Sequence, residues 1–141
     1  MDELEVKKVT HDRICEFQTV IEKLPQIEVP LKHRFLDGLY SREVTMPKGS
    51  IVVSKTHNLE NLTIISQGEC VELTEGHEVR RLKAPCTMIS EPGIKRALYM
   101  LEDTVWTTVH QNPENTRDIK ELEQLYLKPD KSTLKEIEES I

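Results

Sequence analysis

Between Leu39 and His110 the chain consists of short runs rich in β-branched residues, each ended by a turn signal. The turn signals include Pro47-Lys48-Gly49, Gln67-Gly68 and Pro92-Gly93. A new β-rich run begins about every 8 to 12 residues, a spacing typical of a β-sandwich or barrel and not of βαβ units. We predict strands over 39–46, 50–57, 61–67, 69–74, 78–83, 86–90, 95–101 and 104–110.

The segments on either side of this region carry helical patterns. Residues 10–24 form an amphipathic stretch that Thr10 can cap and Pro25 can end. A second stretch, 115–127, has Asn115 or Thr116 as its cap, and 132–141 is a third, short candidate. The predicted organisation is an N-terminal flank, a central β-barrel and a C-terminal helical tail, with bounds 1–38, 39–112 and 113–141.

Composition narrows the classes of partner. The net charge of −6 argues against binding to a nucleic-acid polymer or a membrane surface, both of which require basic patches. The three cysteines have no CxxC spacing, which favours reduced thiols. The sequence shows neither a signal peptide nor a run of 18 apolar residues. We therefore expect a cytoplasmic protein.

Four polar residues stand where a barrel could bring them together. Period-two alternation in the predicted strand 50–57 places Lys55 and His57 on one face, together with Ile51 and Val53. Asn61 opens the next predicted strand, and Arg96 follows the Pro92-Gly93 turn. Their convergence would create a polar site inside the barrel or at its mouth.

This spacing resembles a known family. The pattern Gly49-(x)5-Lys55-x-His57-(x)3-Asn61-(x)6-Gly68 is similar to the first cupin motif, which reads Gly-(x)5-His-x-His-(x)3–4-Glu-(x)6-Gly. Pro92-Gly93-Ile94-Lys95-Arg96 looks like the core of the second motif. The resemblance covers roughly residues 40–110 and implies a mainly β fold, a cupin-like double-stranded β-helix (jelly-roll) barrel. Cupins commonly dimerise, so it also implies a homo-oligomer.

The positions that hold metal in cupins differ here. Lys55 and Arg96 replace histidines, Asn61 replaces the glutamate, and His57 alone is kept. Lysine and arginine offer no lone pair to a cation at neutral pH, so we expect no metal and no other cofactor.

The same cations favour an anionic small molecule, because arginine binds phosphate or carboxylate bidentately and lysine adds a point charge. Trp106 could stack on a nucleobase beside the hydroxyl of Thr108. The predicted ligand is therefore nucleotide-like, and its predicted contacts are Lys55, His57, Asn61, Lys95, Arg96, Trp106 and Thr108.

The segment from Glu102 to His110 also resembles a group of small cupin-like proteins of bacteriophage genomes, in which a Trp-Thr-Thr strand follows the basic Pro-Gly turn. That resemblance implies a phage origin and a host-cell cytoplasmic location. By analogy, such a protein would sequester a host nucleotide signal used in immunity.

Two alternatives remain open. The first is a metal-independent isomerase or epimerase acting on a sugar nucleotide, with His57 as base and Tyr99 or Tyr40 as acid. The second is a structural or interaction protein whose apolar helical faces, 14–24 and 119–126, form a dimer seam. Arg96 could also serve only as an ion-pair partner of Glu91 or Glu102.

Overall fold

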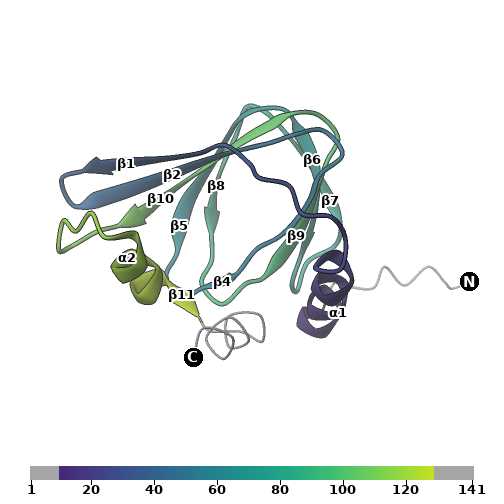
Figure 1. Cartoon of the computed structure of the whole chain (residues 1–141), viewed down its shortest axis with the longest axis horizontal. Helices are drawn as coiled ribbons and strands as arrows, with labels where there is room; N and C mark the ends of the chain where they lie inside the picture. Colours follow the sequence, from purple (N-terminus) through teal and green to yellow (C-terminus); the bar gives the residue numbers. More distant parts are fainter. Residues whose placement is uncertain (1–9, 129–141) are drawn as a thin grey trace, which may run out of the picture.

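The computed structural model describes residues 10–128, and antiparallel strands wrap around one interior (Figure 1). The largest sheet has the strand order β1-β2-β10-β5-β8, a second has β3-β9-β6-β7, and β11 and β4 form a two-stranded sheet. The strands are β1 (Leu31–Leu36), β2 (Leu39–Met46), β3 (Ile51–Val53), β4 (Thr56–His57), β5 (Asn61–Gln67), β6 (Glu69–Thr74), β7 (Arg80–Lys83), β8 (Cys86–Ser90), β9 (Arg96–Met100), β10 (Thr104–Gln111) and β11 (Leu127–Lys128). The predicted mainly β barrel is confirmed, and β2, β5, β6 and β8 have the predicted bounds.

Two strands were not predicted. β1 pairs along its whole length with β2, so the sheet begins inside the segment assigned to the N-terminal flank. β11 pairs with β4 and brings the C-terminal tail against the barrel. The β-structure therefore extends past both ends of the predicted barrel, 39–112.

The predicted strand 50–57 is interrupted. Ser54 donates its backbone N–H to the carbonyl oxygen of Arg96, while its hydroxyl accepts from the Arg96 backbone N–H at 3.1 Å. A side chain thus replaces one rung of the β3–β9 ladder, and β4 leaves that sheet to pair with β11. The predicted alternation consequently does not run through 51–57: Val52, expected on the face opposite His57, packs against the core.

The first helix, α1 (His11–Ile21), begins as predicted. The hydroxyl of Thr10 accepts a hydrogen bond from the backbone N–H of Arg13, which satisfies a free amide of the first turn. The helix ends before the predicted 24, and only Ile14 on its apolar face is fully buried.

The second helix, α2 (Ile119–Tyr126), is capped by Asp118, and the predicted caps Asn115 and Thr116 are wrong. Its Leu122 and Tyr126 are buried against Tyr40 of β2. This face is therefore covered within the chain, contrary to its predicted use as a dimer seam. The predicted helix 132–141 lies outside the described residues. No helix within residues 10–128 is long and apolar enough to cross a bilayer.

The barrel core lies between the two sheets. It consists of buried apolar side chains from both, namely Val44, Met46, Ile65, Cys70, Leu82, Leu98, Met100 and Trp106. Gly68, the last residue of the motif, closes the tight β5–β6 turn at φ 96°. A Cβ there would lie 2.3 Å from the carbonyl oxygen of Asp103, so the close approach of the two chain segments requires glycine.

Candidate functional site

The inward faces of several strands change from apolar to polar along their length. β2 runs from Met46 and Val44 to Arg42, while β10 runs from Trp106 to Thr108 and His110. Antiparallel pairing aligns these changes, because Arg42 stands opposite Thr108 on β10, which in turn stands opposite Thr63 of β5. The barrel therefore has an apolar end and a polar end.

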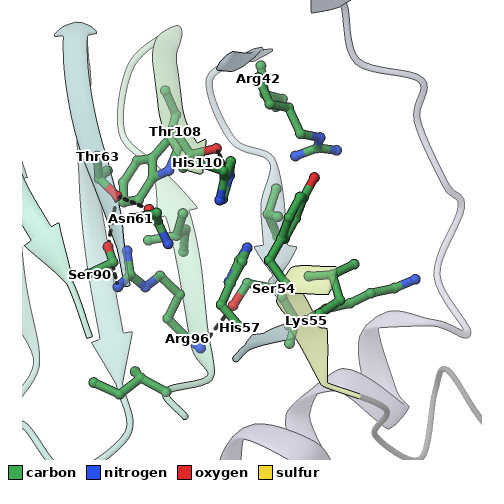
Figure 2. Close-up of a pocket in the computed structure, with 18 of the residues that line it drawn as sticks. Arg42, Ser54, Lys55, His57, Asn61, Thr63, Ser90, Arg96, Thr108 and His110 are labelled. Atoms are coloured by element: carbon green, nitrogen blue, oxygen red, sulfur yellow. Dashed lines mark hydrogen bonds between the residues drawn. The ribbon is translucent and has the colours of Figure 1, made fainter. Parts of the chain in front are cut away.

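A cavity of about 340 Å³ occupies the polar end (Figure 2). Its charged and hydrogen-bonding lining comes from six strands, one helix and the segments between them, and consists of Arg42, Ser54, Lys55, His57, Asn61, Thr63, Ser90, Glu91, Arg96, Thr108, His110, Glu123 and Tyr126. Val44, Val52, Leu98 and Trp106 are among its apolar walls. The volume lies at the lower end of the range for small-molecule sites, roughly 300 to 1,000 Å³.

Arg96 is held in the cavity wall by contacts with three neighbouring side chains. One terminal nitrogen of its guanidinium donates to Ser90 Oγ at 3.1 Å, and the other lies 3.6 Å from Glu72 Oε2. The guanidinium carbon lies 5.5 Å from the ring centroid of Trp106. Only 11% of the side chain is exposed, so the guanidinium is fixed before any ligand arrives.

A chain of hydroxyls continues from Arg96 to Asn61. Ser90 Oγ lies 2.8 Å from Thr63 Oγ1, and Thr63 donates to Asn61 Oδ1 at 3.0 Å. The amide oxygen of Asn61 is therefore occupied, which leaves the amide nitrogen for the cavity (Figure 2). A guanidinium and an amide N–H both donate, so this wall is suited to an oxygen-rich, negatively charged group.

Two histidines and a tyrosine form a parallel stack beside this wall. The ring centroids of His57 and His110 are 5.5 Å apart, and those of His110 and Tyr126 are 4.2 Å apart. Burial, followed by the charges of Arg96 and Arg42, lowers the pKa of His57 to about 4. Burial, the nearby His57 and Arg42 lower the pKa of His110 to about 3. Both rings are therefore neutral at pH 7.

The stack has unused hydrogen-bonding capacity. His110 Nε2 lies 2.8 Å from Thr108 Oγ1, whereas its Nδ1 is buried without a hydrogen-bond partner among the described residues. Within the same residues, no hydrogen bond joins the ring of His57 to another side chain. An unpaired buried nitrogen is costly, which makes these rings candidates for contact with a ligand.

The C-terminal tail builds one wall of the cavity. Tyr126 and Leu127 line it, and the backbone N–H of Asn58 donates to the Tyr126 carbonyl oxygen at 2.6 Å. Leu127 pairs with His57 in the β4–β11 ladder. The tail thus fixes the position of His57, and burial together with Tyr40 raises the pKa of Tyr126, which stays protonated.

Five of the seven predicted contact residues lie together in the cavity, whereas Lys55 lies apart from them at its edge. His57, Asn61, Arg96, Trp106 and Thr108 line the polar end. Lys55 is at its rim, and Figure 2 shows its amine directed away from Arg96. Trp106 is 7% exposed and its ring already packs against Arg96, so it belongs mainly to the core.

Lys95 and the two predicted acids lie elsewhere. Lys95 is fully buried but does not line the cavity, because neighbouring residues of an extended chain point to opposite sides. Tyr99 is 42% exposed and also lies outside the lining, as does Tyr40, whose hydroxyl is 2.6 Å from His33 Nδ1. The acid–base pair expected for an isomerase is therefore not assembled. The expected ion-pair partners of Arg96 were also wrong, since Glu72 takes that place.

Sequence reasoning missed Arg42, Thr63, Ser90, His110 and Tyr126. The signal for Arg42 was its position two residues before Val44 and four before Met46 on a strand whose inward face is otherwise apolar or aromatic. Thr63 and Ser90 carried the same signal on β5 and β8. Nothing local marked Tyr126, which depends on the return of the tail.

The lining does not fit a metal ion. Nowhere in residues 10–128 do three or more histidine, cysteine or acidic side chains gather as a metal site requires. His57 and His110 stack face to face, and the guanidinium of Arg96 would repel a divalent cation. The cations that face the cavity, Arg42, Lys55 and Arg96, therefore have no lone pair to offer a metal ion.

Solved structures share this architecture. A double-stranded β-helix protein from Klebsiella pneumoniae matches with a TM-score of 0.53 at 17% identity, over 67% of this chain and 83% of that one. The cupin domain of Schizosaccharomyces pombe Cnp3 matches with a TM-score of 0.51 at 15% identity, over 65% and 72%. The chain has the cupin fold.

The DMSP lyase DddQ from Ruegeria pomeroyi shares this cupin fold with a TM-score of 0.53 and 22% identity, over 62% of this chain. The match spans about half of the lyase, 49% of its length. No protein-family model and no curated protein matches the sequence. At these identities the comparisons establish the fold, and the ligand has to be argued from the cavity.

Proposed function

We propose that this cupin-fold protein binds a small anion of the nucleotide type without a metal ion. The observation that carries the proposal is the fixed guanidinium of Arg96 in the cavity wall, at the position that the second cupin motif gives to a histidine. Ser90 and Trp106 hold it in place, and Asn61 offers a second donor nearby. A phosphate group would accept from both.

The rest of the cavity supports a ligand that also carries a flat group. Neutral aromatic rings line one side, with His57 stacked at 5.8 Å from Tyr126. A nucleobase packs well against such rings, and its N–H groups would supply donors for the imidazole nitrogens. A mononucleotide has both parts, the phosphate and the heterocycle.

The resemblance of the Glu102–His110 segment to phage proteins supports a proposed role inside a host cell. A protein that captures a nucleotide without altering it would lower the free concentration of that nucleotide in the host cytoplasm. Sequestration of a host immune signal is one use of such binding, and self-association would place several sites on one particle.

A thermal-shift screen of EDTA-treated protein tests the proposal. Phosphate and AMP are the anionic probes, and Mn²⁺ and Zn²⁺ are the metal probes. A ligand at 100 times its Kd stabilises by about 2.7 kcal/mol. That corresponds to a rise in Tm of roughly 5 to 10 °C for a domain of this size.

Two variants test whether the rise in Tm comes from binding in the cavity. Arg96→Met should abolish the shift with AMP, whereas Arg34→Met should keep it, because Arg34 lies on β1 outside the cavity and pairs with Glu43 at 3.0 Å. Stabilisation by the metals with none by the anions would contradict the proposal.

A further inference from the structure

A second cation faces the cavity from β2. Arg42 is exposed at the mouth, opposite His33 on β1 and Thr108 on β10. No carboxylate within residues 10–128 lies within 4.0 Å of its side-chain nitrogens, although Glu123 lines the same cavity. Its guanidinium is therefore available to a ligand, in contrast to that of Arg34, which a glutamate already engages.

Arg42 and Arg96 stand on opposite sides of the histidine stack. Figure 2 shows Arg42 above His110 and Arg96 below it, with His57 between the two cations. Both guanidinium charges act on His57, which places each of them within electrostatic reach of the space beside that ring. The cavity thus presents two separate donor groups across a neutral aromatic wall.

A ligand with one anionic group would engage one of these cations and leave the other facing water. A ligand with two anionic groups would engage both, with arginine forming paired hydrogen bonds at each end. The cavity of about 340 Å³ is near the lower limit for small-molecule sites, which favours one nucleoside unit over an oligonucleotide.

We infer that the ligand carries two linked anionic groups, as a nucleoside diphosphate does, with Arg96 holding one group and Arg42 the other. This inference rests on the proposed function. Arg42 acts as the residue that separates ligands with two phosphates from ligands with one. Arg96 supplies the contact that both kinds of ligand need.

Calorimetric titration of the EDTA-treated full chain with AMP and with ADP tests the inference. ADP should bind at least about tenfold more tightly than AMP, the equivalent of one additional charged hydrogen-bonded contact. Arg42→Met should abolish the preference for ADP, so that the variant binds ADP and AMP with the same affinity. Arg34→Met is the matched control and should leave both affinities unchanged.

The outcomes separate the two claims. Equal affinities for AMP and ADP in the unaltered protein would overturn the inference and leave the proposed function standing. An ADP preference that survives Arg42→Met would also overturn it. Absence of binding by AMP, ADP and inorganic phosphate alike would overturn the proposed function and this inference together.

Discussion

The ion pair between Arg96 and Glu72 predicts a specific coupling between fold stability and the binding site. The Glu72 side chain is fully buried, and its Oε2 has no hydrogen bond, with Arg96 3.6 Å away. Its Oε1 accepts from Arg80, whose side chain is 49% exposed. Arg96→Met would keep an unbranched apolar side chain while removing the positive charge that faces Oε2 of this buried carboxylate.

The expected cost follows from the separation of the charges. Coulomb's law with an effective dielectric constant of about 20 gives about 4 to 5 kcal/mol at the 3.6 Å between the two groups. Breaking a buried pair typically costs roughly 3 to 5 kcal/mol, because one charge stays buried without compensation. Since Arg80 still contacts Glu72, we expect Arg96→Met to lower the free energy of unfolding by about 3 kcal/mol.

A double-mutant cycle isolates this term. In Glu72→Gln protein the carboxylate is absent, so adding Arg96→Met should cost about 1 to 2 kcal/mol less than it does in the unaltered chain. Urea unfolding gives each free energy, followed by the fluorescence of Trp106, the single tryptophan, and in parallel by circular dichroism. Additive effects, with a coupling below about 0.3 kcal/mol, would refute the reasoning.

Three further predictions concern the stack, the turn and the hydroxyl network. His57 and His110 have pKa values lowered to about 4 and about 3, so the unfolded chain binds protons at these rings more readily than the folded chain does. The free energy of unfolding should therefore be at its full value above about pH 6.5 and fall by about 2 kcal/mol or more by pH 5. In urea titrations at the two pH values, a His57→Gln/His110→Gln variant should show a much smaller fall. Gly68→Ala should lower the free energy of unfolding by about 3 kcal/mol or more, because the added Cβ would lie 2.6 Å from Thr104 Oγ1. A Tm within about two degrees of that of the unaltered protein would contradict this prediction. Ser90→Ala removes the hydroxyl that accepts a hydrogen bond from Arg96, and it should weaken AMP binding about fivefold and lower the free energy of unfolding by about 1 kcal/mol. Unchanged AMP affinity in calorimetry would show that Arg96 does not need the hydrogen bond to Ser90.

The strands of the barrel could be predicted from the sequence where a turn residue ends a regular alternation of buried and exposed positions. β5 and β6 have the expected bounds because alternating inward residues end at Gly68, where a Cβ would clash with Asp103 and Thr104. β1 was missed because charged residues interrupt its apolar pattern, as on many edge strands. Its signal was Asp37-Gly38, a dipeptide that favours a two-residue hairpin turn between two strands.

The sequence predicted several residues that line the polar cavity, but it did not predict all of them. The spacing of His57, Asn61 and Arg96 was sufficient to bring them to one end of the barrel. Of the adjacent pair Lys95 and Arg96 only one can face the interior, and a stricter use of alternation would have excluded Lys95. Tyr126 could not be predicted, because its place beside His57 depends on the long-range pairing of β11 with β4.

The proposed function requires the polar cavity of the barrel to bind an anion without a metal ion. Calorimetric titration of AMP into EDTA-treated protein at pH 7, before and after addition of Mn²⁺, tests it most directly. We predict saturable binding that Mn²⁺ leaves unchanged and that Arg96→Met abolishes. Binding of AMP only after Mn²⁺ is added, with the effect lost in His57→Ala, would contradict the claim and identify a metal site.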